Sequence, residues 1–328
     1  MATLTPTFAA AHQPEDVTYR RVAPLRREEA LALLLTGAVG GSRAVVEQFL
    51  GFASDQSLSL DHLWGAYRAE SGKLLASTLL VHCAGRTAMT FVSPPQKDVH
   101  ANIVGGLVQA ACVSQDPLRV RLVQGLLDAG QFREAEALTA AHFTKLAHLV
   151  YMQRISLPLL EPLRLDAGIE TVLWKPELRR DFCATILASY EDTADCPGLL
   201  GVREIDDILD GHMATGEFKA HLWMILRRGG EPVAVMLLNP VLQGQAMELV
   251  YLGIAKKWRG RGLGRQLLLH GLGLTRQERI KQVILAVDEA NLAAMALYRS
   301  MKFTPTARKL AMIWKVGEER QHAGENVQ

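Results

Sequence analysis

The stretch from residue 247 to residue 303 constrains the fold of this chain more than any other. An apolar run, Met247 to Ile254, is typical of a buried strand, and a basic, glycine-rich turn follows at residues 259–265. Leu263, Leu267 and Leu274 then recur at helical spacing. Glycines let a backbone approach an anion closely, and the free N–H groups of a helix start point toward it. The order strand, glycine turn, helix therefore predicts a phosphate-binding site.

Three phosphate-binding motifs can be compared with this turn. A P-loop needs Lys-Ser or Lys-Thr after its glycines, and neither pair follows here. A dinucleotide-binding Gly-x-Gly-x-x-Gly also fails, because Arg265 or Leu267 occupies its last position. Arg259, Gly262 and Gly264 fit the pattern Arg-x-x-Gly-x-Gly in full. For these six residues alone, the alternative is an ordinary basic loop before a helix.

The pattern resembles the coenzyme A pyrophosphate motif of the GCN5-related N-acetyltransferase (GNAT) superfamily. Residues 291–303 resemble that superfamily's closing signature, Asn-x-x-Ala-x-x-Leu-Tyr-x-x-x-Gly-Phe, with Asn291 and Tyr298 at the matching separation. Lys302 departs from the signature, which has glycine before Phe303. That glycine shapes a turn and does no chemistry, so the implied activity is retained.

The resemblance implies an acyltransferase that uses acetyl-CoA as co-substrate, with no metal. Tyr298 is the implied acid for the departing thiolate. Glu248 is the implied base, and a structural carboxylate is its alternative; in a regular strand it lies on the same face as Ile254. Backbone N–H groups near Gly253 and Ile254 are expected to hold the thioester carbonyl. The implied cofactor-binding residues are Leu252, Gly253, Ile254, Arg259, Gly260, Arg261, Gly262, Leu263, Gly264, Arg265 and Asn291.

The second half of the chain repeats the first at a spacing of about 159 residues. His62-Leu63-Trp64 recurs as His221-Leu222-Trp223, and Phe143-Thr144 recurs as Phe303-Thr304. Three further matches stand between them in the same order. Five ordered matches at one spacing predict two copies of one domain.

The first copy lacks the residues that carry the chemistry of the second. Pro94 and Pro95 stand opposite the glycine turn and have no N–H to offer an anion. Thr90 and Thr139 stand where the second copy has its glutamate and tyrosine. We therefore expect a degenerate, structural first copy; a second site with altered chemistry is the alternative.

The expected fold is α/β, with two tandem GNAT-like domains, each a mixed, mostly antiparallel sheet flanked by helices. The expected boundaries are a disordered tail at 1–17, the degenerate domain at 18–157, a linker at 158–165, the active domain at 166–316 and a disordered tail at 317–328. This two-copy arrangement resembles that of the mycothiol synthases, and residues 286–291 are similar to their corresponding region.

The expected reaction transfers an acetyl group to an amine of a small molecule by direct attack on the thioester. Protein N-acetylation and non-catalytic acyl-CoA binding are the alternatives. Four acidic residues in the second copy either attract a cationic amine or form a solvated helix face: Glu204, Asp206, Asp207 and Asp210. Cys196 fits a plain thiol better than a nucleophile, because no paired histidine is evident.

The composition limits the classes of partner that the chain is expected to bind. The net charge of +2 gives no general affinity for polyanions, and the local arginines suit a small anionic cofactor better than a nucleic acid. No apolar run reaches a membrane span, and the N-terminus lacks a signal-peptide pattern. Four widely spaced cysteines are expected to be reduced. We therefore expect a cytoplasmic protein that binds neither nucleic acid nor membrane, and a monomer built as an internal pseudo-dimer.

Overall fold

The computed structural model describes residues 16–38, 40–97 and 99–317. The predicted tails at 1–17 and 317–328 fall almost entirely outside these residues. Contacts divide the chain into two compact units that do not coincide with the two sequence halves. The first unit consists of the chain up to Val81, Phe91–Ser114 and Phe132–His142, and the second consists of His82–Thr90, Gln115–Gln131 and the chain from Phe143 onward.

The first unit is an antiparallel sheet with helices on both faces. Strand β2 pairs with β1 on one edge and with β3 on the other. Leu31 and Leu33 pack against one face of this sheet, and Val104 and Leu107 pack against the other. Its elements are β1 (Val17–Arg21), α1 (Arg27–Thr36), α2 (Arg43–Asp55), β2 (Leu63–Arg68), most of β3 (Leu74–Cys83), α3 (Ala101–Val113) and α4 (Phe132–Ala140).

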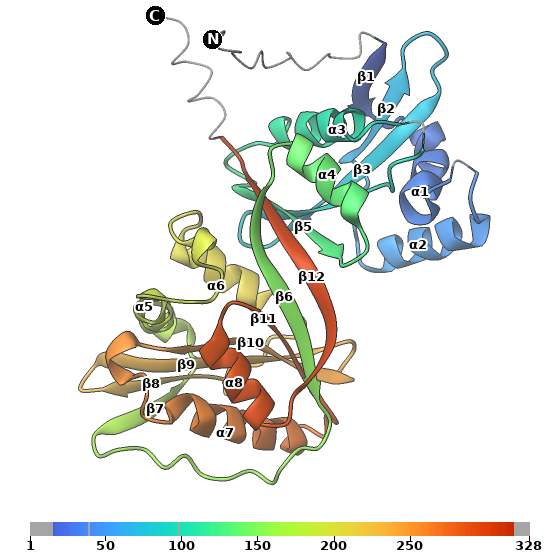
Figure 1. Ribbon diagram of the computed structural model, residues 1–328. Coiled ribbons are helices and arrows are strands. Elements are labelled where there is room, and N and C mark those ends of the chain that lie inside the picture. Colours follow the sequence, from blue (N-terminus) through green and yellow to red (C-terminus); the bar gives the residue numbers. More distant parts are fainter. Residues whose placement is uncertain (1–15, 39, 98, 318–328) are drawn as a thin grey trace, which may run out of the picture. The chain divides into compact units, whose positions relative to one another are not determined.

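The second unit holds the larger sheet and four helices, shown in Figure 1. Its strands are most of β4 (Thr87–Val92), β5 (Leu122–Asp128), β6 (Thr144–Arg154), β7 (Ile169–Leu173), β8 (Trp223–Arg228), β9 (Glu231–Val241), β10 (Ala246–Ile254), β11 (Val283–Asp288) and β12 (Thr304–Lys315). Its helices are α5 (Arg179–Tyr190), α6 (Ile205–Met213), α7 (Leu263–Gln277) and α8 (Leu292–Ser300). The predicted α/β class with mostly antiparallel pairing is confirmed.

A strand of the first sequence half separates two strands of the second half in this sheet. The strand order is β5-β12-β6-β11-β10-β9-β8-β7, so β6 separates β11 from β12. Met152 of β6 faces Leu285 on one side and Pro305 on the other, in antiparallel register with both neighbours. The sheet therefore does not follow the expected boundary at residues 158–165, although the strand predicted at Met247–Ile254 is present as β10.

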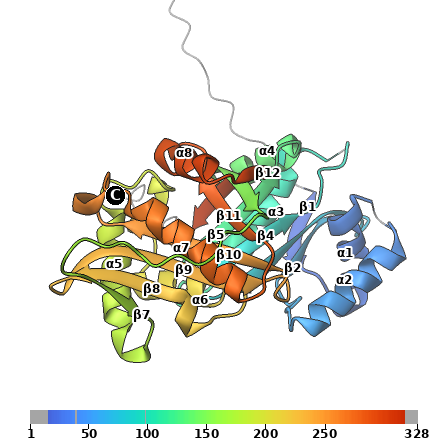
Figure 2. The ribbon, with the colours of Figure 1, turned by 90° about the horizontal axis from the view of Figure 1, so that it is seen from below.

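Helices cover both faces of the second unit's sheet. Leucines of α7 pack on one face together with Met295 and Tyr298 of α8, and Figure 2 shows α7 lying across the β9–β10 part of the sheet. Phe182 of α5 and Leu209 of α6 pack on the other face around Trp223. The two faces thus have separate apolar cores, and both reach β10.

The expected linker lies along α7 rather than in solvent. Residues 158–165 contain no helix or strand, in keeping with their prolines. A Cβ on Gly273 would lie 2.4 Å from the Leu160 Cα, so only glycine permits this approach. The Glu161 carbonyl accepts a hydrogen bond from His270 when Nδ1 carries the proton, and the Arg164 N–H donates to Gln266 Oε1.

Candidate active site

Strands β10 and β11 separate shortly after they begin to pair. They are parallel partners only at Met247 with Val283 and at Glu248 with Ile284. A bulge between Leu249 and Tyr251 then shifts the register of β10 against β9. A bulge bends its strand and increases the local twist, so from Leu249 onward β10 turns away from β11 and leaves an open edge.

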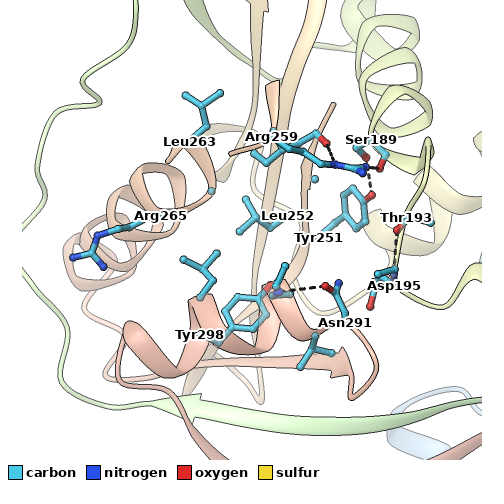
Figure 3. A pocket seen from close by; sticks show the side chains of 18 of the residues that line it. Ser189, Thr193, Asp195, Tyr251, Leu252, Arg259, Leu263, Arg265, Asn291 and Tyr298 are labelled. Atoms are coloured by element: carbon cyan, nitrogen blue, oxygen red, sulfur yellow. Dashed lines mark hydrogen bonds between the residues drawn. The ribbon is translucent and has the colours of Figure 1, made fainter. Parts of the chain in front are cut away.

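A cavity of about 630 Å³ occupies this opening. Its volume falls in the range usual for small-ligand sites. The residues around it come from the loop after α5, from β10, from the glycine turn, from β11 and from α8 (Figure 3). The predicted cofactor-binding residues that line it are Leu252, Gly253, Ile254, Arg259, Gly260, Gly262, Leu263, Gly264, Arg265 and Asn291, and Tyr298 lines it too.

The glycine turn presents bare backbone to this cavity. Gly260 and Gly262 both have φ of +76°, which glycine adopts without strain, and a Cβ built on either would meet no atom within 4 Å. Gly262 is the N-cap of α7, whose first internal bond runs from the Gln266 N–H to the Gly262 carbonyl. The N–H groups at the start of α7 are therefore available to an anion.

The arginines of the turn are engaged by protein groups. The Arg259 guanidinium donates to four carbonyls, those of Ile254, Ser189, Glu191 and Asp192, at 2.7 to 3.1 Å. Arg261 does not line the cavity; its guanidinium lies 4.7 Å from the centre of the Trp258 ring. Arg265 donates to the sulfur of Met301. The three charges contribute a positive field, while the direct anion contacts fall to the backbone.

The alternation of a strand decides which β10 amides face the opening. The Ala255 N–H donates to the Val233 carbonyl on the β9 side. Because N–H groups alternate along a strand, the Gly253 N–H also points toward β9. Leu252 and Ile254 direct theirs into the opening, so of the two residues expected to hold the carbonyl the N–H of Ile254 faces the opening and that of Gly253 does not; carbonyl binding itself stays a prediction. Gly253 instead allows Ser189 to approach, since a Cβ there would lie 2.4 Å from Ser189 Oγ.

Helix α8 carries Asn291 and Tyr298 at the cavity edge. Asn291 caps the helix, with Oδ1 accepting the Ala294 N–H at 3.2 Å. At the other end the Phe303 N–H donates to the Tyr298 carbonyl and the Phe303 ring lies 5.7 Å from that of Tyr298. This is a Schellman motif with its apolar contact. Lys302 takes the left-handed position with φ of +64°, where the superfamily signature has glycine.

Comparison with known proteins identifies this segment. Residues 168–303 match the Acetyltransferase (GNAT) family. This part of the chain belongs to the GNAT family. The glycine turn, β10 and α8 all lie inside the matched residues.

The relatives support the same assignment over shorter stretches. The chain is 48% identical over 61 residues to mycothiol acetyltransferase from Thermobispora bispora and 28% identical over 76 residues to human N-acetyltransferase 8B. These matches cover 19% and 23% of this chain but only 21% and 34% of the relatives.

Two solved structures resemble the fold of nearly the whole chain. A GCN5-related N-acetyltransferase from Sphaerobacter thermophilus covers 92% of this chain and 96% of its own, with a TM-score of 0.54 at 18% identity. A fungal GCN5-related glucosamine N-acetyltransferase region covers 94% of this chain and 39% of that protein, with a TM-score of 0.55 at 14% identity. Within the described ranges, no helix is long and apolar enough to cross a membrane.

Glu248, the predicted base, lies on a different face of β10 from the one expected. The bulge between Leu249 and Tyr251 reverses the alternation of β10, so Glu248 is not on the same face as Ile254. The expectation of a shared face is wrong for this reason. Glu248 is absent from the residues that line the cavity. Burial raises its pKa, and its charge acts on Tyr151 of β6.

The acidic residues of α6 are paired with arginines. Asp206 and Asp210 accept from Arg179 at 2.8 Å each, and Asp207 accepts from Arg86 at 2.6 Å. They do not line the cavity. Of the two open interpretations of this cluster, a cationic-amine site and a solvated helix face, the contacts favour neither; they make it an ion-pair surface.

Sequence reasoning missed Asp195. It lies in the loop after α5 and lines the cavity, where Figure 3 places it between Thr193 and Asn291. The protein atoms around its carboxylate limit hydration and raise its pKa. The neighbouring Cys196 has its pKa raised to about 12, first by burial and then by Asp195 and Asp288, which favours the plain thiol over the nucleophile.

Proposed function

We propose that this protein is an acetyl-CoA-dependent N-acetyltransferase that acetylates an amine of a small molecule by direct attack on the thioester. The observation that carries the proposal is the cavity itself. It brings the bare glycine turn, the open amides of β10 and the Tyr298 side chain to one space. Curated relatives of this GNAT domain include mycothiol acetyltransferases, which supports a small-molecule acceptor.

The residues present fit the phosphates and thioester of acetyl-CoA. Backbone N–H groups from Gly262 to Arg265 would face the pyrophosphate at the start of α7. The N–H groups of Leu252 and Ile254 would donate to the thioester carbonyl and to the oxyanion that forms there. Asn291 caps α8 beside the same cavity.

Chemistry then proceeds by proton and acyl transfer. The free amine attacks the carbonyl carbon and forms the C–N bond. The C–S bond breaks, and the thiolate takes a proton from the Tyr298 hydroxyl, which receives the surplus proton of the new amide nitrogen. Burial and then the charge of Asp195 raise the pKa of Tyr298, so the phenol is protonated at neutral pH and can act as the acid.

A panel of primary amines tests the proposal by release of free thiol from acetyl-CoA. We expect release with at least one small amine and none with Gly262→Asp, whose carboxylate would stand against the pyrophosphate. Acetyl-CoA binding without release for any amine would favour the acyl-CoA-binding alternative. Release only with peptide or protein acceptors would favour protein acetylation.

We also propose that the first sequence half is a degenerate copy of the GNAT domain. Left-handed residues recur at the spacing of the sequence repeat: Ser57 and Gly216, Gly72 and Gly230, Gly85 and Gly244, His142 and Lys302. Such backbone positions are set by tight turns and so mark equivalent loops. In place of a glycine turn the first half has Pro94 and Pro95, and the Gln96 side chain bonds the carbonyls of Gly37 and Pro94.

A further inference from the structure

Two carboxylates face the cavity among the residues that line it, and they differ in their partners. Asp192 is paired with Lys256 at 2.7 Å, and its side chain is 71% exposed. For Asp195 no ion pair is found within residues 16–38, 40–97 and 99–317. Asp195 is thus the cavity carboxylate whose charge is left for a ligand.

The loop holds the Asp195 carboxylate from one side. The Asp195 N–H donates to Thr193 Oγ1 at 3.1 Å and closes a tight turn. Its Oδ1 accepts the Asp288 N–H at a long 3.3 Å. In the part of the chain that the structure describes, no hydrogen bond reaches Oδ2. One oxygen therefore anchors the group and the other is available in the cavity.

The groups around Asp195 carry no compensating positive charge. Each element packed against it contributes an acid, a phenol or a thiol: Cys196 from its own loop, Tyr190 from α5, Tyr251 from β10, Asp288 from β11 and Tyr298 from α8. Of the two cations that line the cavity, Arg259 is bound by four carbonyls and Arg265 donates to the sulfur of Met301. An incoming ammonium group would supply the missing charge.

We propose that Asp195, rather than Glu248, is the catalytic base and the anchor of the acceptor amine. This rests on the proposed function. The acceptor binds as a primary ammonium, with an N–H directed at Oδ2 of Asp195. Asp195 removes one proton from the ammonium nitrogen, and the resulting lone pair attacks the thioester carbon. The proton on Asp195 returns to solvent after the amide and free thiol form, so the net products are amide, thiol and one proton.

The assignment predicts the substrate class. Acceptors are cationic amines, whereas neutral nitrogen groups such as amides and anilines are poor substrates. The other carboxylates of the loop, Glu191 and Asp192, are balanced by Lys256, so discrimination for positive charge depends on Asp195.

The test is the pH dependence of single-turnover acetyl transfer. Acetyl-CoA is used with 1,4-diaminobutane, glucosamine and alanine amide at pH 6 to 9.5. With Asp195 as base, the wild-type rate is flat between the pKa of Asp195 and that of the amine. Asp195→Asn must wait for amine deprotonated in solution, so its rate rises about tenfold per pH unit until the pH reaches the pKa of the amine. At pH 7 it is slower by about 10²–10⁴-fold, while acetyl-CoA affinity stays within about twofold of wild type.

Three variants make the outcome decisive. Glu191→Gln, on the same loop, is expected to keep wild-type rate and profile. Glu248→Gln is expected to keep the flat profile. Asp195→Glu retains a carboxylate and is expected to be slow but flat, which serves if Asp195→Asn does not fold.

The assignment is overturned by an Asp195→Asn rate within about threefold of wild type with a flat profile. It is also overturned if Glu248→Gln, and not Asp195→Asn, acquires the rising profile. If wild-type protein binds acetyl-CoA but transfers acetyl to no amine, the proposed function fails and this assignment fails with it, an outcome distinct from the first two.

Discussion

Tyr298 is fixed from both ends of a short helix. Asn291 caps the first turn of α8, and the Phe303 ring packs on the Tyr298 ring just past its last turn. The hydroxyl is therefore placed by capping and packing, and no hydrogen bond to it is found within the residues that the structure describes. The Tyr298 hydroxyl can therefore be removed by mutation without loss of the packing contacts of the ring.

Tyr298→Phe should lower the single-turnover acetyl-transfer rate by about 10²–10⁴-fold, because the thiolate loses its proton donor. Acetyl-CoA affinity and thermal stability should change little, since the ring and its contact with Phe303 remain. Rapid-mixing measurement of thiol release checks this. A rate within about twofold of wild type would make Tyr298 a packing residue only.

Lys302 occupies a backbone position suited to glycine. With φ of +64° it ends α8 as the left-handed residue of the Schellman motif. Lys302→Gly should raise the free energy of unfolding by about 1 kcal/mol, because glycine adopts this conformation without Cβ strain. Urea unfolding measures the gain. His142→Gly, at the equivalent place after α4 with the same φ of +64°, is the matched comparison.

Individual site residues were predictable where a motif carried them. Gly260, Gly262, Asn291 and Tyr298 all reach the cavity, as the signatures indicate. The face of Glu248 was not predictable, because a β-bulge leaves no mark in an apolar run. Asp195 was missed because it stands in an irregular loop with no spacing rule, and its neighbours along β11 and α8 are distant in sequence.

At the scale of elements, Arg259 ties the glycine turn to the end of α5. Its four acceptors include the last carbonyls of that helix, where a cation is favoured. One guanidinium thus joins the glycine turn on one side of the cavity to the loop after α5 on the other. Arg259 therefore holds these two segments in place more than it supplies positive charge to the cavity.

Arg259→Lys should behave like Arg259→Met, although lysine keeps the charge, because neither can make four directed bonds. Both should raise hydrogen exchange of residues 189–195 by at least about tenfold, which corresponds to about 1.4 kcal/mol of lost loop stability. Mass spectrometry measures this. Wild-type exchange in Arg259→Lys, with fast exchange in Arg259→Met, would show instead that charge is what matters.

The helices and strands themselves were the most predictable feature. The expected strand at Met247–Ile254 is β10 (Ala246–Ile254), and the expected helix with Leu263, Leu267 and Leu274 is α7 (Leu263–Gln277). Periodicity decides such elements locally. The place of β6 between β11 and β12 was not predictable, because strand partners are chosen by long-range pairing that a single sequence does not encode in its periodicity.

At the scale of the molecule, calorimetry should find one acetyl-CoA site per chain. At this place the first half has prolines, and the Gln96 side chain donates to the carbonyls of Gly37 and Pro94. The second half has free backbone N–H groups there. Gly262→Asp should reduce the stoichiometry to zero. Two sites of equal affinity in the wild type would show that the first half is not degenerate.

His212 should make stability depend on pH. Its Nε2 is buried without a partner in the described chain, its ring stacks on Tyr251, and burial with the charge of Arg203 lowers its pKa to about 4. The unfolded chain, with a histidine pKa near 6.5, therefore binds more protons between those values. Stability is complete above about pH 6.5 and falls toward pH 4, by on the order of 3 kcal/mol.

Urea unfolding at pH 7.5 and pH 5 measures this dependence. His212→Phe keeps the stacking and removes the titrating group, so its free energy of unfolding should fall less between the two pH values than that of wild type. His148→Gln, at an exposed strand position, should keep the wild-type dependence. Equal falls for His212→Phe and wild type would show that other groups dominate.

The position of β6 gives the first half a structural role in the sheet of the second half. Residues 144–154 pair with β11 and β12 along both edges. A chain that began at residue 158 would therefore form a sheet with a strand missing from its middle. Two raw edges would then face each other across a gap, an invitation to self-association. The first half is therefore needed for this sheet whatever reaction the protein carries out, and the sheet cannot close until both halves have been synthesised.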